Sequence, residues 1–188
     1  IEEGYLDEAG VAESTGGRKP IIVRFLSDAR YSFGVCVTPS KIRIALINFK
    51  LEIIKEKEFK LSQDIESIDI VMDKIKRCID ELVDSFNIPK DKVIGVGFSL
   101  PGTVNEEELL LVNAPNLKLN NIDFKKYERL YGYKLFMENE ANAAAYAETF
   151  INPDKVIKNL VFVSITEGIG TGIIDRKSTR LNSSHHPD

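Results

Sequence analysis

Hydrophobic and polar residues follow two different periods along the chain, and the changes of period predict a mixed α/β protein. Short segments rich in β-branched or aromatic residues read as strands, and they cover residues 21–25, 31–37, 41–49, 51–59, 92–99, 134–137 and 160–166. Longer segments with helical spacing cover residues 65–86, 122–131 and 139–151. In the longest of these, the apolar positions that follow helical spacing are Ile68, Val71, Ile75, Cys78, Ile79, Leu82 and Phe86.

The order of these elements indicates the fold class. Consecutive strands come first, with a tight turn at 38–40, and helices then alternate with strands. This order is typical of an α/β domain. Residues 92–99 are almost continuously apolar, which suits a parallel strand buried on both faces. We therefore expect one α/β lobe over residues 29–174.

The segment at 1–28 differs from the rest of the chain. Its first part is acidic and mixed, and residues 13–20 form a turn-rich loop that carries Arg18 and Lys19 just before the strand at 21–25. A turn, a basic pair and a flanking strand suit the wing of a winged helix-turn-helix. In this interpretation the basic pair contacts backbone phosphates or enters the minor groove of DNA. The alternative is an ordinary solvated hairpin, which is what a short basic pair usually marks.

Composition narrows the class of protein. The 188 residues are 43% hydrophobic and 29% charged, with a net charge of −4, as in a folded globular protein. A negative net charge argues against a protein surface that is basic all over and binds nucleic acid everywhere, but it is compatible with a small local basic patch. No apolar run approaches the roughly 20 residues of a membrane span, and no signal peptide is evident at the N-terminus. We expect a cytoplasmic protein without a membrane partner, and we expect Cys36 and Cys78 to be buried free thiols.

The end of the chain has a different character. Residues 175–188 are polar and aperiodic, and they resemble the conceptual translation of a sequencing adapter. We therefore expect this segment to be a non-native tail and leave it out of the fold. It contains both histidines of the chain, His185 and His186, so no metal site is inferred from them.

The most informative motif is at 138–148, which reads Glu-Asn-Glu-Ala-Asn-Ala-Ala-Ala-Tyr-Ala-Glu. It places Asn139 and Glu140 at a strand-to-helix junction, where polar side chains can face a cleft. Helix capping explains the same two residues without any ligand, since Asn is a good N-cap and Glu favours the first turn. Upstream, the Pro-Gly pair that includes Gly102 is by itself a generic turn. The amide of Asn116 offers both the donors and the acceptors that a ring hydroxyl can use.

Together these motifs resemble the ROK family, sugar kinases and sugar-responsive repressors built on the actin-like ATPase (ribonuclease H-like) fold. The resemblance runs over residues 1 to about 174. It implies that Gly102, Asn116, Asn139 and Glu140 bind the sugar. It also implies that the glycines of the segment 168–172 are a vestigial phosphate loop, formed by Gly168, Gly170 and Gly172.

Departures from the kinase pattern favour a repressor. The family's kinases carry their catalytic base, an Asp, where this chain has Glu140. Cys36 stands about where they carry an acidic residue on the first strand, and Pro39 offers no backbone donor for a phosphate. Phosphoryl transfer depends on positioning and on magnesium held by carboxylates, so we expect no enzyme. The segment 13–20 resembles the wing of the family's repressors.

Two alternatives stay open at this point. One is a ROK sugar kinase that uses ATP and magnesium, with Glu140 as its base. The other is a DNA-binding protein that has lost its response to sugar. For the repressor, the resemblance implies operator DNA and a monosaccharide as partners, a homodimer or homotetramer, and no cofactor in this part of the protein. It places a recognition helix upstream, and a second lobe with a structural zinc downstream.

Overall fold

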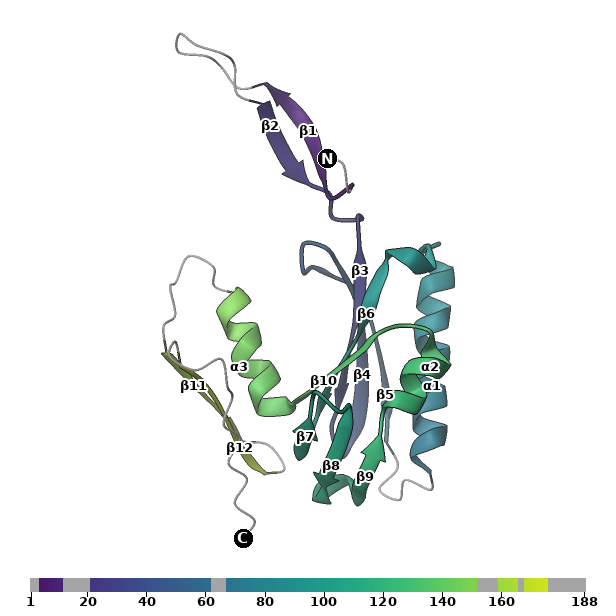
Figure 1. The fold of residues 1–188 in the computed structure, drawn as a ribbon, viewed down its shortest axis with the longest axis vertical. Helices are drawn as coiled ribbons and strands as arrows, with labels where there is room; N and C mark the ends of the chain where they lie inside the picture. The colour runs from purple at the N-terminus through teal and green to yellow at the C-terminus, as the bar shows by residue number, and fades with distance from the viewer. Residues whose placement is uncertain (1–3, 12–20, 62–66, 152–158, 166–167, 176–188) are drawn as a thin grey trace.

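The computed structural model describes residues 4–11, 21–61, 67–151, 159–165 and 168–175. Its centre is a five-stranded sheet with the strand order β10-β6-β3-β4-β5 (Figure 1). These strands are β3 (Tyr31–Val37), β4 (Lys41–Asn48), β5 (Ile53–Lys60), β6 (Val93–Leu100) and β10 (Leu135–Asn139). The first three form an antiparallel meander, whereas β6 runs parallel to β3 and β10 runs parallel to β6. The expected α/β lobe is therefore present.

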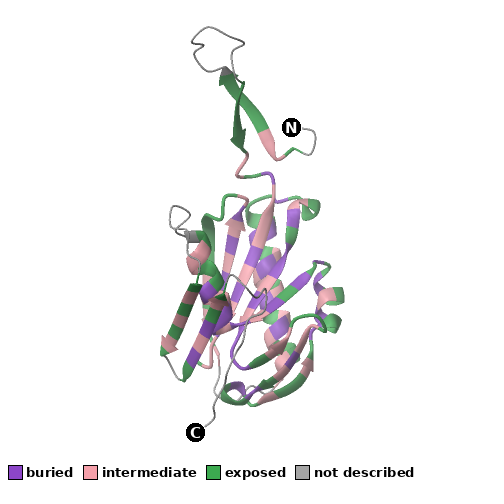
Figure 2. Ribbon diagram, turned by 60° about the vertical axis from the view of Figure 1, so that its left-hand side comes forward, coloured by how far each residue is buried: buried purple, intermediate pink, exposed green. Residues whose placement is uncertain are grey.

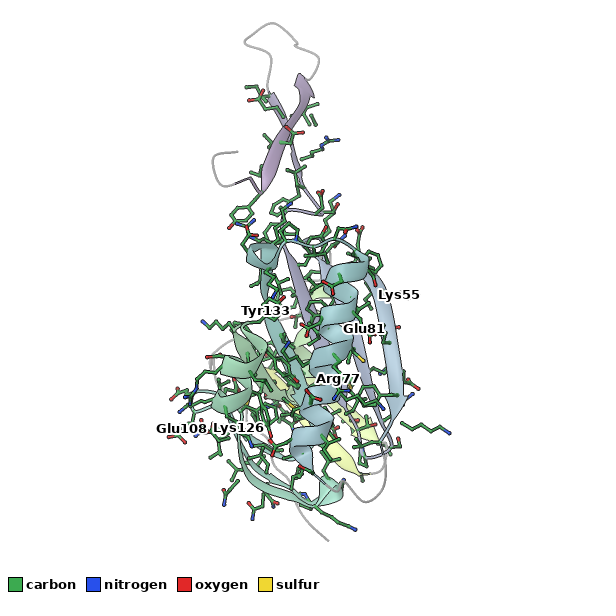
Figure 3. The ribbon with its side chains drawn as sticks, turned by 90° about the vertical axis from the view of Figure 1, so that its right-hand side faces the viewer. Lys55, Arg77, Glu81, Glu108, Lys126 and Tyr133 are labelled. Carbon is green, nitrogen blue, oxygen red and sulfur yellow. The ribbon has the colours of Figure 1, made fainter. Side chains whose placement is uncertain are left out.

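Helices α1 (Ile68–Ser85) and α2 (Lys125–Tyr131) lie on one side of this sheet (Figure 1). The buried face of α1 packs on alternate residues of the strands, so burial alternates along β3 and β4 (Figure 2). Charged side chains such as Arg77 and Glu81 lie along the rest of α1 (Figure 3). The residues that α1 buries are Met72, Ile75, Ile79, Leu82 and Val83.

The ends of α1 differ from the sequence prediction. The helix begins at Ile68 because the Ser67 hydroxyl accepts a hydrogen bond from the Asp69 N–H at 3.2 Å, which is an N-cap. It ends at Ser85, and Phe86 is the C-cap residue with a 43% exposed side chain. Residues 65 and 66 lie outside the described part of the chain. No helix of the described residues is long and apolar enough to cross a membrane.

On the other side of the sheet lie α3 (Glu140–Ile151) and the hairpin of β11 (Asn159–Ile165) and β12 (Ile169–Asp175) (Figure 1). Asp175 pairs with Asn159, so this strand includes the first residue of the expected tail. Residues 176–188 lie outside the described residues, and the prediction of a non-native tail stays a prediction.

The sequence pattern did not indicate a small three-stranded sheet that follows Gly102. It consists of β7 (Thr103–Asn105), β8 (Leu110–Ala114) and β9 (Leu119–Asp123), and the short helices η1 (Lys90–Lys92) and η2 (Pro115–Leu117) lie nearby in the sequence. The helix expected at 122–131 begins only at Lys125, because residues 122 and 123 belong to β9 and the Asp123 side chain accepts a hydrogen bond from the Lys125 N–H at 2.8 Å.

Strand β5 forms one edge of the central sheet, opposite β10 at the other edge. It starts at Ile53 rather than at Leu51, because Leu51 has φ +64° and lies in the turn. Asn48 holds that turn: its side-chain oxygen accepts hydrogen bonds from the N–H groups of Lys50 and Glu52 at 2.9 and 3.0 Å. From residue 55 to residue 58 the strand alternates Lys and Glu.

The N-terminal part forms an antiparallel hairpin of β1 (Leu6–Val11) and β2 (Ile21–Phe25), which projects from the lobe (Figure 1). Strand β2 was predicted and β1 was not, since its acidic and glycine residues hide the strand pattern. All of β2 is exposed, including Ile21 and Val23 at 54% and 50%. Arg18 and Lys19 lie outside the described residues, so their role in DNA binding stays a prediction.

Candidate functional site

The candidate site is a cavity of about 610 Å³ where several elements of the lobe end together. The turn between β3 and β4, the end of β6, η2, the start of α3 and β11 all contribute to it. This volume is in the range of small-molecule sites. Its lining includes Cys36, Thr38, Pro39, Ser40, Lys41, Arg43, Ser99, Pro101, Asn116, Glu140, Ala143, Ala144, Phe162, Ser164 and Gly168.

Two of the predicted sugar residues, Asn116 and Glu140, line this cavity. They come from positions 24 apart in the sequence, one on η2 and one on the first turn of α3. Asn116 is exposed, and its amide group lies next to Gly168. A Cβ atom built on Gly168 would be 3.8 Å from the Asn116 amide nitrogen. An amide and a carboxylate offer both the donors and the acceptors that ring hydroxyls can use.

Asn139 has a different position from these two. It is 5% exposed, and its side-chain oxygen accepts hydrogen bonds from the N–H groups of Ala141 and Asn142 at 2.9 and 3.3 Å. Its amide nitrogen donates to the Gly102 carbonyl at 2.8 Å. Asn139 therefore caps α3 and fixes the loop after β6, as the capping alternative predicted. Direct contact with a sugar stays a prediction for this residue.

Gly102 lies in the buried turn that Asn139 holds. It has φ +97°, and a Cβ at this position would lie 2.1 Å from the Asn113 carbonyl oxygen. Only glycine fits this combination of backbone conformation and close approach. The close approach is to the protein's own β8 strand, and it packs the turn against the segment that leads to Asn116.

The turn between β3 and β4 forms one wall of the cavity. The Thr38 hydroxyl is used to close the turn, because it donates to the Lys41 carbonyl at 2.8 Å and accepts from the Lys41 N–H at 3.1 Å. Cys36, the residue at the expected carboxylate position, lines the cavity as a half-buried free thiol. Cys78 is also a half-buried free thiol, so the prediction of free thiols is confirmed, while their burial is only partial.

The glycines at 168–172 do not form a single loop. Gly170 and Gly172 are in strand β12, whose inner side packs on α3. A Cβ at Gly172 would lie 2.3 Å from the Ala141 carbonyl oxygen, and one at Gly170 would lie 3.3 Å from the Ala141 Cβ. These two glycines therefore allow close strand-to-helix packing, and the expectation of a glycine loop was wrong for them. Gly168 alone lines the cavity.

A pair of acidic side chains beside the site was not singled out from the sequence. Glu138 accepts hydrogen bonds from the Asn139 N–H at 2.7 Å and from the Asn142 amide at 3.0 Å. A hydrogen bond with Glu138, together with burial, raises the pKa of Glu106 to about 7. Both carboxyl groups line a second cavity of about 610 Å³, which shares Cys36 and other lining residues with the first. The sequence signal for Glu138 was its place in the Glu-Asn-Glu motif.

The fold and the cleft define the class of the protein as an actin-like lobe of the kind found in sugar kinases and related regulators. A sequence model described as "ROK family" matches residues 33–180. The chain therefore belongs to the ROK family.

Curated relatives include repressors. The chain is 30% identical over 178 residues to the xylose repressor of Caldicellulosiruptor bescii, a match that covers 93% of this chain and 44% of the relative. It is 32% identical over 177 residues to the xylose repressor of Bacillus subtilis, covering 93% and 45%. It is 21% identical over 175 residues to the transcriptional dual regulator NagC of Escherichia coli, covering 93% and 43%. The chain thus spans about half the length of these relatives.

Solved structures share the fold. A ROK family transcriptional regulator, described as a homologue of the Escherichia coli MLC protein, has a TM-score of 0.73 at 23% identity and covers 96% of this chain and 45% of that chain. A ROK family glucokinase from Streptomyces griseus, solved with glucose and AMPPNP, has a TM-score of 0.64 at 22% identity, covering 82% and 48%. The fold is therefore common to regulators and kinases.

Proposed function

We propose that this chain is part of a sugar-responsive transcriptional repressor, which binds a monosaccharide in the cleft and DNA through a winged helix. The observation that carries the proposal is the composition of the cleft. Asn116 and Glu140 line it with groups that suit sugar hydroxyls, while Cys36 occupies the wall where a kinase needs a carboxylate for magnesium. Such a cleft can recognise a sugar without transferring a phosphoryl group.

Glu140 is the central ligand in this proposal. A carboxylate forms charge-assisted hydrogen bonds with hydroxyl groups, and these are about twice as strong as neutral ones. Its side chain is one methylene longer than the aspartate of the kinases, and a displacement of about 1 Å can cost roughly 10²-fold in a positioned reaction. A sensor tolerates this change because it has no proton to move.

The β1–β2 hairpin supports the second half of the proposal. The ROK sequence model begins at residue 33, beyond the hairpin, whereas the regulator structure covers 96% of the chain and the glucokinase covers 82%. The regulator structure therefore covers more of this chain than the glucokinase does. We propose that this hairpin belongs to the wing of the DNA-binding domain, with Arg18 and Lys19 on DNA phosphates or in a minor groove.

The names of the relatives suggest which sugar to test first. Several are xylose repressors and others are named for N-acetylglucosamine. We take xylose as the first candidate effector, with glucose and N-acetylglucosamine as comparisons. We further propose that the full-length protein is a homodimer or homotetramer in the cytoplasm and that its structural zinc lies outside this chain.

The second candidate is a ROK sugar kinase that uses ATP and magnesium with Glu140 as base. It is favoured by the fold shared with a glucokinase that binds glucose and AMPPNP. It is disfavoured by Cys36 and by the hairpin. Turnover of ATP in the presence of a sugar at about 1–100 s⁻¹ would support the kinase and contradict a protein that only represses.

The proposal is tested by calorimetric titration of the full-length protein with the three sugars. Glu140→Gln keeps the size of the side chain and removes its charge, so we expect the sugar Kd to rise by about 10- to 100-fold. Asn116→Ala is expected to raise it by about 3- to 10-fold. Asn120→Ala, on β9 and outside the cleft lining, is the matched control and should leave the Kd unchanged. A sugar Kd that is the same in Glu140→Gln, in Asn116→Ala and in the unmodified protein would contradict the assignment of the site.

A further inference from the structure

The β3–β4 hairpin connects the candidate sugar cleft to the base of the β1–β2 hairpin. Its turn, at 38–40, forms one wall of the cleft. Its two strands pair without interruption from Val37↔Ile42, next to the turn, to Tyr31↔Asn48 at the other end. The two strands are flanked by β6 and β5 within the sheet, and alternate residues of both are buried in the core. One stiff element thus has one end in the cleft and the other end outside it.

The far end of this element meets the β1–β2 hairpin through three aromatic rings. The Phe49 ring, which directly follows β4, has its centroid 5.3 Å from that of Tyr5 and 5.2 Å from that of Phe25. The Arg30 guanidinium, directly before β3, lies 4.8 Å from the centre of the Tyr5 ring. We call these four residues the aromatic joint. Both strands of β3–β4 therefore end in it.

Backbone hydrogen bonds make the same connection. The Leu26 N–H donates to the Tyr5 carbonyl at 3.0 Å, which closes the base of the β1–β2 hairpin. The Phe49 N–H donates to the Ser27 carbonyl at 2.9 Å, which attaches the end of β4 to the segment entering β3. Asn48, 9% exposed, fixes the turn after Phe49 through its side-chain hydrogen bonds. Phe49 is therefore presented to the hairpin on a defined backbone.

We infer that the aromatic joint couples the sugar cleft to the DNA-binding part of the protein. This inference rests on the proposed repressor function. A sugar can change DNA affinity only if it favours one of two arrangements that differ at the DNA-binding part. Sugar contact with the turn of β3–β4 favours one tilt of this paired element. The same tilt moves the Phe49 ring against Tyr5 and Phe25, which changes how the β1–β2 hairpin is held.

The test measures coupling separately from binding. In the full-length protein, operator Kd is measured by fluorescence anisotropy with and without the effector sugar, and sugar Kd is measured by calorimetry. The ratio of the two operator Kd values is the coupling factor, which is about 5- to 150-fold for typical allosteric proteins. For Phe49→Ala we expect both Kd values for the single ligands to stay within about 3-fold while the coupling factor falls toward 1. Unchanged single-ligand Kd values with a reduced coupling factor identify a residue that acts between the two sites, whereas loss of a ligand-binding residue would raise one of the Kd values.

Matched variants make the result specific. Phe49→Tyr keeps the ring and should keep the coupling factor. Phe86→Ala removes a 43% exposed ring that follows α1 and is not one of the four joint residues, and it should also keep the coupling factor. Arg30→Gln removes the cation over Tyr5 from the edge of the joint and should lower the coupling factor without affecting folding. None of the three rings of the joint is in the hydrophobic core cluster, so Phe49→Ala is expected to fold. If it does not fold, the coupling factor of Arg30→Gln tests the inference in its place.

Two outcomes overturn the inference, and they are distinguishable. If the unmodified protein responds to sugar and neither Phe49→Ala nor Arg30→Gln lowers the coupling factor, the joint carries no coupling and the proposed function stands. If the unmodified protein binds no sugar, or binds operator DNA equally with and without it, the proposed function fails and the joint fails with it.

Discussion

Asn139 offers the sharpest test of how the site is built, because one side chain caps α3 and also holds the Gly102 carbonyl. Asn139→Ala removes both contacts. Loss of an N-cap costs about 1 kcal/mol, and a buried carbonyl left without its partner costs about 1–3 kcal/mol. We expect the free energy of unfolding to fall by about 3 kcal/mol. For a chain of this length that corresponds to a melting temperature lower by about 6–12 °C.

The two contributions can be separated by a second variant. Asn139→Ser keeps a side-chain oxygen for the helix N–H groups but has no amide to reach the Gly102 carbonyl. We expect it to recover about 1 kcal/mol relative to Asn139→Ala. Urea unfolding followed by circular dichroism at the helix band measures both variants, and an unchanged slope with urea shows that the unfolding transition is comparable.

Either of two results would contradict these roles of Asn139. An alanine variant within about 0.5 kcal/mol of the unmodified protein would mean that neither contact contributes, since ordinary surface substitutions stay in that range. A serine variant as unstable as the alanine variant would mean that the cap contributes nothing and that the Gly102 contact accounts for the whole loss.

Two further predictions concern the neighbourhood of the cleft. Gly102→Ala forces a side chain into a φ +97° conformation and against the Asn113 carbonyl, so we expect a loss of more than about 2 kcal/mol in urea unfolding. Gly97→Ala is its control, because the nearest atom to a Cβ there is 3.9 Å away, and equal effects of the two would contradict the geometry. The raised pKa of Glu106, about 7 instead of 4.5 because of Glu138 and burial, means that the folded protein keeps a proton that the unfolded chain loses. The stability that this proton contributes is therefore present below about pH 4.5 and is lost as the pH rises to about 7. Glu106→Gln should reduce this decline, measured as the urea midpoint at each pH. A variant with the same pH dependence as the unmodified protein would disprove the prediction.

The central sheet and α1 could be predicted from the sequence because their periodic patterns are long and strongly apolar. Burial in β4 falls on the alternate residues Ile42, Ile44 and Leu46. The pattern failed at Asn48 and Phe49: the asparagine is buried to hold a turn, and the phenylalanine follows the strand to meet the hairpin. Such roles depend on contacts between distant segments, which local periodicity does not record.

The site was predictable only in part. Asn116 and Glu140 came from a motif and do line one cavity. The small sheet β7–β9 was missed because its strands are short, with three to five residues each. The glycines in strand β12 were predicted to form a loop because a glycine pattern alone does not distinguish a turn from close packing. The hydrogen bond with Glu138 that raises the pKa of Glu106 joins residues 32 apart in the chain, so no local pattern indicated it.

The charged alternation of β5 has a consequence for how copies of the protein meet. An edge strand offers unpaired backbone groups to any other strand, and this is a common start of aggregation. The charges along this edge alternate in sign over Lys55, Glu56, Lys57 and Glu58. A strand of a second copy could pair here only if opposite charges faced each other, and each of these side chains would lose bound water. Because the signs alternate, every second register brings like charges together. The edge strand β5 therefore disfavours strand addition in those registers by its own sequence.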